Sequence, residues 1–147
     1  MTLNLKNFLT QDMIRLKIDV PDHIAALRAG AQLLVDHGGV EPQYIDAILE
    51  CLREFGPYVV IAPGLALGHA RPDASVHFTC FSLITLTRPV VFGVPDNDPV
   101  DVIFSFAAPD KQGHIEALRQ MANLCSDEEN MQKIRSATRA EEILALL

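Results

Sequence analysis

The residues best suited to chemistry stand together in one turn, Gly68 to Asp73, which reads Gly-His-Ala-Arg-Pro-Asp. Because glycine has no Cβ atom, the backbone at Gly68 can approach a ligand closely, and Pro72 restricts the exit from the turn. Histidine changes protonation near neutral pH and can act as nucleophile, base or metal ligand. We interpret His69 as a candidate nucleophile, and the alternative is a solvated or capping loop histidine.

A cation stands two residues after this histidine. The guanidinium of Arg71 is a candidate for neutralising the charge of a bound phosphate, because it can donate two parallel hydrogen bonds. Its alternative is a solvated turn residue. Glu50 and Arg53 lie earlier, on a predicted helix, where a solvated helix face is the better interpretation.

A second histidine, His114, stands near the start of a helix predicted from Lys111 to Cys125, with Asp110 as its N-cap. Helix N-termini offer free N–H groups and a positive dipole end to anions. If the preceding strand brings this helix beside the His69 turn, His114 could hold a phosphoryl group on the facing imidazole. The alternative is a core histidine paired with a neighbour.

The remaining histidines fit structural positions, with His77 at a strand edge and His23 and His37 at helix ends. A metal site would need ligands from His69, His77, His114, Asp73, Asp96 and Asp98. No HExxH or comparable ligand spacing supports such a site, and no glycine-rich nucleotide motif is present. We therefore expect neither a metal nor another cofactor.

An apolar segment leads into the His69 turn. Tyr58 to Ile61 predicts a strand, Pro63-Gly64 a break, and Leu65 to Leu67 a short apolar run. Elsewhere the patterns predict three more strands, Met13–Asp19, Phe78–Leu86 and Val100–Ala107, and a loop at Arg88–Pro99. They also predict helices at Asp22–His37, Pro42–Phe55 and Lys111–Cys125. Two short helices are predicted to begin at Ser126 and Thr138. This order predicts one α/β domain over residues 1–147, with a mixed sheet of about five strands and helices on both faces.

Composition excludes several classes of protein. The net charge of −7 argues against nucleic acid as the main partner, and no apolar run has the length of a membrane span. The opening segment MTLNLKNFLTQD lacks the features of a secretory signal. The three cysteines, Cys51, Cys80 and Cys125, form neither a disulfide framework nor a zinc motif. We expect buried thiols in a reducing cytoplasm.

The segment Ala62–Pro72 resembles the active-site segment of the mannitol/fructose-type enzyme IIA of the bacterial phosphoenolpyruvate-dependent sugar phosphotransferase system. Upstream Gly56-Pro57-Tyr58 and the His-Ala-Arg-Pro reading are most similar to its ascorbate-type branch. The resemblance continues through Pro89–Gly93, Ala107–Asp110, His114 and Ser126–Glu129. It covers nearly the whole chain and implies the same mixed α/β fold.

The resemblance also implies an activity. His69 would accept a phosphoryl group from the small phosphocarrier HPr and pass it to a cysteine of enzyme IIB, which phosphorylates a sugar during uptake through membrane enzyme IIC. His114 matches a second histidine beside the phosphorylated one. Leu65 and Leu67 would border the docking surface. The alternative is a regulatory module controlled by the same phosphorylation, and neither the oligomeric state nor the reacting ring nitrogen follows from the sequence.

The chain departs from the family pattern at two positions. The motif commonly reads Pro-His-Gly, whereas here Gly68 and Ala70 flank the histidine. An arginine commonly stands near the end of the preceding helix, whereas here the position holds Cys51. A fixed positive charge is therefore missing, and Arg71 or Arg53 would have to replace it.

Overall fold

The computed structural model describes residues 5–147. Residues 1–4, the start of the segment assessed above for a secretory signal, lie outside the described residues. The helices are α1 (His23–Asp36), α2 (Gln43–Phe55), α3 (Lys111–Cys125), α4 (Glu128–Ser136) and α5 (Ala140–Leu144), preceded by 3-10 turns η1 (Leu5–Asn7) and η2 (Gln11–Met13). The strands are β1 (Ile14–Ile18), β2 (Val60–Ala62), β3 (Leu65–Gly68), β4 (Cys80–Val90) and β5 (Val100–Ala107).

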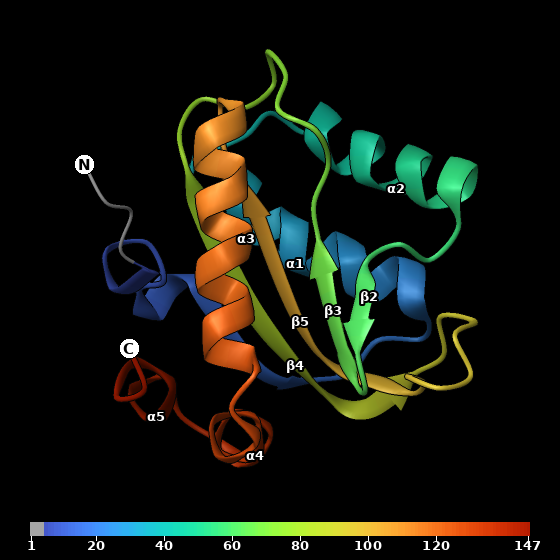
Figure 1. The fold of residues 1–147 in the computed structure, drawn as a ribbon, viewed down its shortest axis with the longest axis vertical. Coiled ribbons are helices and arrows are strands. Elements are labelled where there is room, and N and C mark those ends of the chain that lie inside the picture. The colour runs from blue at the N-terminus through green and yellow to red at the C-terminus, as the bar shows by residue number, and fades with distance from the viewer. Residues whose placement is uncertain (1–4) are drawn as a thin grey trace.

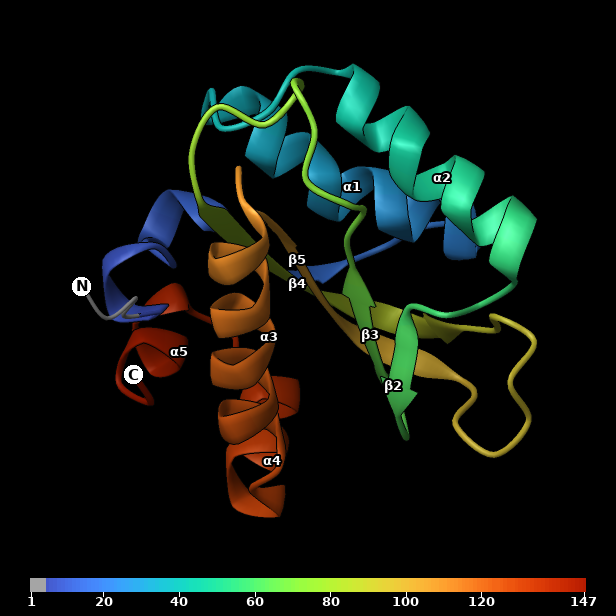
Figure 2. The same cartoon turned by 45° about the horizontal axis from the view of Figure 1, so that its top comes forward.

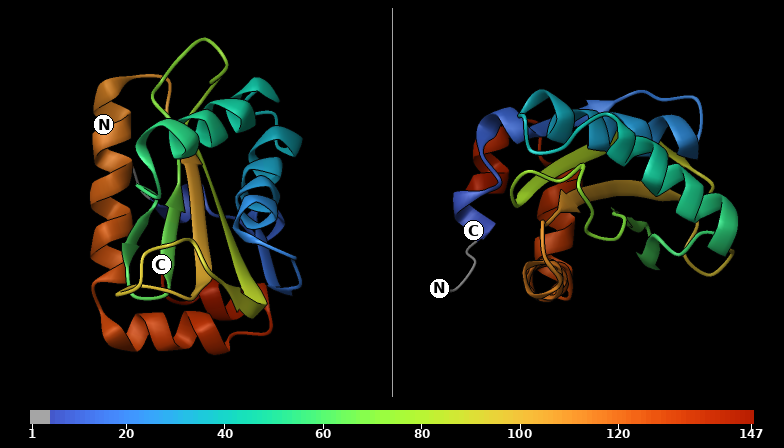
Figure 3. Two further views of the ribbon diagram at one scale, coloured as in Figure 1. Left: turned by 90° about the vertical axis from the view of Figure 1, so that its right-hand side faces the viewer. Right: turned by 90° about the horizontal axis from the view of Figure 1, so that it is seen from above.

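Within residues 5–147 the strands form one sheet of five, in the order β1-β4-β5-β3-β2. The outer pair β1–β4 and the central pair β3–β5 are parallel, whereas β4–β5 and β2–β3 are antiparallel. Helix α1 covers one face of the sheet and α3 the other (Figures 1 and 3). Helix α2 lies alongside α1, as Figure 2 shows. The predicted α/β fold with a mixed sheet is confirmed.

The local signals explain most element boundaries. Asp22 and Asp110 cap α1 and α3 by accepting the backbone N–H groups of Ala25 and Gly113. The last two helices each begin one residue later than their capping patterns suggested. Asp127 caps α4, and the carboxylate of Glu142 accepts the N–H groups at the start of α5.

Two features of the sheet go beyond the sequence prediction. The apolar run after Pro63-Gly64, which the sequence did not assign to an element, forms strand β3 and pairs in parallel with β5 over its whole length. Strand β4 continues to Val90, through part of the predicted Arg88–Pro99 loop. Pro89 is tolerated there because the β4–β5 register is irregular between Thr85 and Val90, where no regular ladder needs its missing N–H.

A row of small residues lets α1 approach the sheet closely. Gly68, Ser105 and Ser82 lie side by side on β3, β5 and β4, and Gly30 of α1 packs on this row. A Cβ atom at Gly30 would lie 2.6 Å from Ser105 Oγ, so any larger residue would force this hydroxyl to move. Ser82 Oγ donates a 2.7 Å hydrogen bond to the Gly30 carbonyl. The hydroxyl of Ser105 is buried and has no partner among the described residues.

These two serines give a matched test of the packing. Ser82→Ala should lower the free energy of unfolding by about 1 kcal/mol, because it removes a made hydrogen bond. Ser105→Ala should raise it by about 1 kcal/mol, because it removes a buried hydroxyl that no group satisfies. Urea denaturation of both variants measures the difference. Equal destabilisation by the two substitutions would contradict this account of the interface.

Candidate active site

The imidazole of His69 is held between two aromatic rings where β3 ends. It stacks on Phe106 at the end of β5, with ring centroids 5.2 Å apart and an interplanar angle of 17°. The ring of Tyr58 meets it edge-on, also at 5.2 Å, and the Tyr58 hydroxyl donates to the His69 carbonyl. The histidine is therefore fixed in orientation through both its side chain and its backbone.

A hydrogen bond selects the tautomer of His69. Its Nδ1 lies 2.7 Å from the carbonyl oxygen of Leu67. A carbonyl oxygen only accepts, so Nδ1 carries the proton and Nε2 keeps a free lone pair. Burial is the main reason why the pKa of His69 lies below its ordinary value, with a further decrease from His114. The neutral, nucleophilic form is thus present at neutral pH.

His114 faces His69 from the first turn of α3. The two ring centroids are 5.5 Å apart, and His114 also contacts the Phe106 ring. Its Nδ1 is buried without a partner among the described residues, and burial lowers the pKa of the imidazole. A proton on Nδ1 would be an unsatisfied buried donor. The neutral ring therefore carries its proton on Nε2, where it can be donated to a neighbouring group.

The fold brings His69 and His114 together, as predicted. The N-terminus of α3, however, offers fewer free N–H groups to an anion than expected. The carboxylate of Asp110 accepts the N–H of Gly113 at 2.6 Å. This amide is thus already bonded within the protein and is not free for an anion. The contribution of α3 to the site comes from the His114 side chain.

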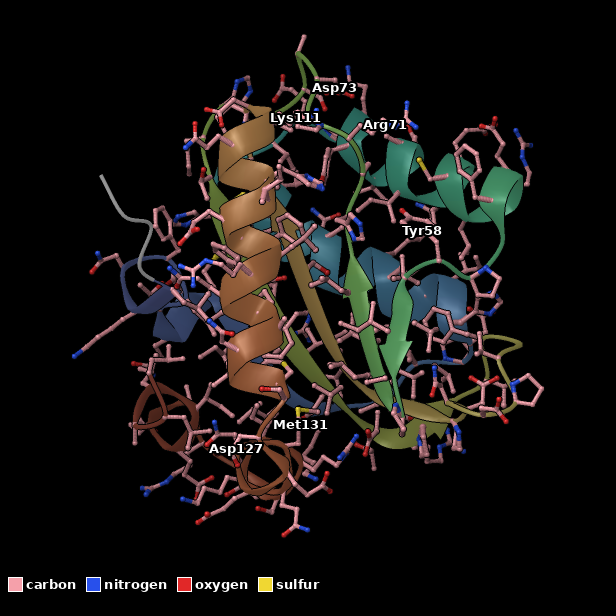
Figure 4. All side chains as sticks on the ribbon, in the orientation of Figure 1. Tyr58, Arg71, Asp73, Lys111, Asp127 and Met131 are labelled. Carbon is pink, nitrogen blue, oxygen red and sulfur yellow. The ribbon has the colours of Figure 1, made fainter. Side chains whose placement is uncertain are left out.

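A pocket of about 330 Å³ opens over the imidazole. Its lining comes from the end of α2, the approach to β2, the His69 turn and the start of α3, and comprises Cys51, Phe55, Tyr58, His69, Ala70, Arg71 and His114. Arg71 is exposed, and no ion pair engages it within residues 5–147. Figure 4 shows Tyr58 and Arg71 at the end of the sheet nearest α2.

The position where the family commonly has an arginine lies in this pocket. Here Cys51 lines the wall together with Tyr58. Cys51 is thus a site residue as well as a packing residue. Arg53 does not replace the missing charge, because it points to solvent and pairs with Glu50 at 2.5 Å. Among the described residues, Arg71 is the one guanidinium in the pocket lining.

The prediction that Leu65 and Leu67 border the docking surface was wrong. Leu65 and Leu67 are only 2% exposed because β3 is covered on both faces, so they belong to the core. Two large apolar side chains are exposed near the pocket instead. Phe55, which lines it, is 61% exposed, and Ile115, which follows His114, is 57% exposed.

The other candidate ligands lie outside the site. The carboxylate of Asp98 accepts three backbone N–H groups of the loop before β5. That loop contacts Gly64 at the start of β3, the strand end opposite His69. Asp73 bonds Ser75, and His77 pairs with Glu41. Within residues 5–147 no three His, Cys, Asp or Glu side chains are grouped as metal ligands would be.

Sequence reasoning did not identify two of the residues that hold His69. Phe106 looked like one more apolar position of a strand, and Tyr58 belonged to a motif without an assigned contact. No local pattern marks either contact, because both depend on how β3 pairs with its neighbours. The only available signal was the Gly-Pro-Tyr sequence upstream of the turn.

Comparison with known proteins shows the family to which the chain belongs. The model of the family "Phosphoenolpyruvate-dependent sugar phosphotransferase system, EIIA 2" matches residues 7–147. The ascorbate-specific PTS system EIIA component of Escherichia coli (strain K12) is 44% identical over 135 residues, which are 91% of this chain and 88% of that protein. The chain belongs to this EIIA 2 family and is a phosphocarrier component of the phosphotransferase system.

Solved structures share the fold. The mannitol-specific cryptic phosphotransferase enzyme IIA from Escherichia coli superposes with a TM-score of 0.86 at 28% identity, covering 98% of this chain and 97% of that one. Enzyme IIA of the mannitol system, solved in complex with phosphorylated enzyme IIB, gives a TM-score of 0.81 at 24% identity, covering 93% and 94%. The predicted family resemblance is confirmed. None of the helices in residues 5–147 has the length and apolar character that crossing a bilayer needs.

The lowered pKa of His69 gives a prediction about pH. Its NMR titration should have a midpoint below 6.5, the ordinary value. Between the two pKa values the unfolded chain binds more protons than the folded chain, so the free energy of unfolding rises with pH through that window. His69→Gln should reduce this rise, measured by urea denaturation at several pH values below neutrality. A midpoint at or above 6.5 would contradict the assigned environment.

Proposed function

We propose that this chain is the enzyme IIA of a sugar phosphotransferase system of the ascorbate type, and that His69 carries the phosphoryl group on Nε2. The observation that carries the proposal is the hydrogen bond from His69 Nδ1 to the Leu67 carbonyl, which leaves Nε2 as the basic nitrogen of a pocket imidazole. The ascorbate assignment is supported by the 44% identical relative.

The reaction consists of two displacements at phosphorus. The lone pair of Nε2 attacks the phosphoryl group on the histidine of HPr, a new N–P bond forms, and the imidazole of HPr leaves with the old bonding pair. A thiolate of enzyme IIB then attacks the phosphoryl group on His69. An S–P bond forms, and the electron pair of the broken N–P bond returns to Nε2. Because imidazole is both nucleophile and leaving group, the site needs mainly to position the group and stabilise its charge.

Two side chains are placed to stabilise that charge. His114 donates its Nε2 proton to a phosphoryl oxygen, which fits a neutral ring whose other nitrogen is buried. Arg71 supplies the positive charge that Cys51 does not. As an exposed residue it can move toward the phosphoryl group or toward a docked partner.

The partners meet the protein around the pocket. HPr and enzyme IIB dock in turn on two exposed apolar side chains, Phe55 of α2, which lines the pocket, and Ile115 of α3, which follows His114 in the chain. A IIA–IIB assembly is described for the mannitol relative of the same fold. Membrane enzyme IIC takes part only through enzyme IIB, and the whole chain acts as one enzyme IIA unit in the cytoplasm.

The central test is the phosphorylation of His69. Incubation with phosphoenolpyruvate, enzyme I and HPr should add one phosphoryl group to the wild-type protein, detected by intact-protein mass spectrometry as an acid-labile adduct. His69→Ala should gain none. His114→Ala should still gain the group, but more slowly, because it keeps the nucleophile and loses a donor to the phosphoryl oxygens.

Transfer onward distinguishes transport from regulation. The phosphorylated protein should lose its group to a soluble ascorbate-type enzyme IIB domain, and replacement of the acceptor cysteine in that domain should block the loss. Normal phosphorylation of His69→Ala would refute the proposed carrier residue. Transfer to a mannitol-type enzyme IIB with none to the ascorbate type would refute the assignment of the branch.

The two arginines near the site give a matched pair. Arg71→Ala should slow phosphoryl transfer by more than tenfold, since about 2 kcal/mol of charge stabilisation is removed from a site without another guanidinium. Arg53→Ala should leave the rate unchanged, because Arg53 pairs with Glu50 on the solvated face of α2. Rapid-quench measurement of both variants provides the comparison. Equal rates in Arg71→Ala and the wild type would exclude Arg71 as the replacement cation.

A further inference from the structure

The hydroxyl of Tyr44 is a polar group placed deep in the core, beside the candidate active site. Tyr44 lies in the first turn of α2 and is 0% exposed. Its hydroxyl accepts the backbone N–H of Ala70 at 3.0 Å and donates to the carbonyl of Phe106 at 2.9 Å. The carbonyl of Ala70, at 3.3 Å, is the more distant acceptor. These partners belong to the two segments that carry the stacked His69 and Phe106 rings.

The register of β3 and β5 shows what this hydroxyl replaces. Their parallel pairing runs from Leu65↔Val102 to Gly68↔Ser105 and then stops. At its start, Val102 N–H donates to the Gly64 carbonyl. Hydrogen bonds of a parallel ladder are evenly spaced and follow a two-residue repeat on each strand. Continued in this register, the ladder would next join the N–H of Ala70 to the carbonyl of Phe106.

The Tyr44 hydroxyl occupies the place of that hydrogen bond. It accepts from the donor and gives its own proton to the acceptor, so both backbone groups are satisfied without meeting each other. Burial raises the pKa of this phenol, so the hydroxyl keeps the proton that it donates. Because an oxygen atom is inserted, the two chains are held farther apart than a direct ladder bond would hold them.

The separation occurs at the residues that define the site. Phe106 provides both the carbonyl acceptor and the ring on which the imidazole stacks, and Ala70 directly follows His69. We propose that Tyr44 is a positioning residue for phosphoryl transfer. Its hydroxyl holds the ends of β3 and β5 apart and thereby determines how the His69 imidazole stacks on the Phe106 ring. The inference rests on the proposed role of His69 as carrier.

The experiment compares Tyr44→Phe with the wild type in transfer from phosphorylated HPr. The variant keeps the ring and lacks only the bridging oxygen. The rate at saturating HPr should fall by more than tenfold, because the imidazole loses its fixed orientation. The KM for HPr should not change, since a fully buried side chain cannot touch the partner. In the same variant, the chemical shifts of the His69 ring protons should lose the ring-current contribution of Phe106.

The control variant is Ser82→Ala. It also removes a buried hydroxyl that bonds a backbone carbonyl, but at the interface with α1 and not at the strand ends. It should lower the midpoint of urea denaturation while transferring at the wild-type rate. Loss of activity in both variants, in proportion to lost stability, would reduce Tyr44 to a packing residue and overturn the inference.

A measurement on the wild type keeps the inference testable if Tyr44→Phe does not fold. The amide of Ala70 should exchange with solvent as slowly as amides within β3, because the hydroxyl accepts its hydrogen. Exchange at the rate of an unbonded loop amide would overturn the bridge.

The two proposals fail in different ways. A wild-type chain that is never phosphorylated on His69 contradicts the proposed function. A wild-type chain phosphorylated on His69, together with a Tyr44→Phe variant that transfers at the same rate, contradicts only the role of Tyr44.

Discussion

The hydrogen bond between His69 Nδ1 and the carbonyl of Leu67 is the interaction on which the proposed chemistry of this site depends. A free imidazole exchanges its proton between two nitrogens and rotates about two bonds. Here the bond to a residue of its own strand fixes the tautomer, while Phe106 and Tyr58 fix the ring plane. The paired strands hold the Leu67 carbonyl in place, so the pairing that stabilises the sheet also fixes the orientation of the proposed nucleophile, Nε2.

The electrostatics of the site differ from those of a typical phosphate pocket. Both imidazoles are half-buried with lowered pKa values, so neither brings a positive charge at neutral pH. The one guanidinium in the lining is exposed. In the proposed mechanism the phosphoryl group is therefore held by neutral donors and one exposed cation. Such a site stabilises the phosphohistidine only moderately, which suits a carrier that must release its group as readily as it accepts it.

The sequence predicted elements whose signals are local. Strand β5 shows a period of two, and α3 begins after an aspartate cap, so their predicted bounds agree with the structure. Strand β3 was missed because four buried residues have no periodicity that separates a strand from a connector. His69, His114 and the substitution at Cys51 were found through residue type and family resemblance. Stacking on Phe106, the choice of ring nitrogen and the bridge by Tyr44 depend on strand register and rotamers, which no local pattern encodes.

The two ends of β3 differ in whether an insertion beside them would affect the site. One end leads into the imidazole, and the other contacts a loop whose shape is maintained by the carboxylate of Asp98 and its three backbone donors. The three hydrogen bonds to Asp98 are made within the loop, and neither they nor the contact with Gly64 involve a residue of the pocket lining. Insertions, tags or an appended domain at the Asp98 end would leave the approach of a partner to His69 unobstructed. The Asp98 loop is thus a place where a further domain could be attached at a distance from the His69 pocket.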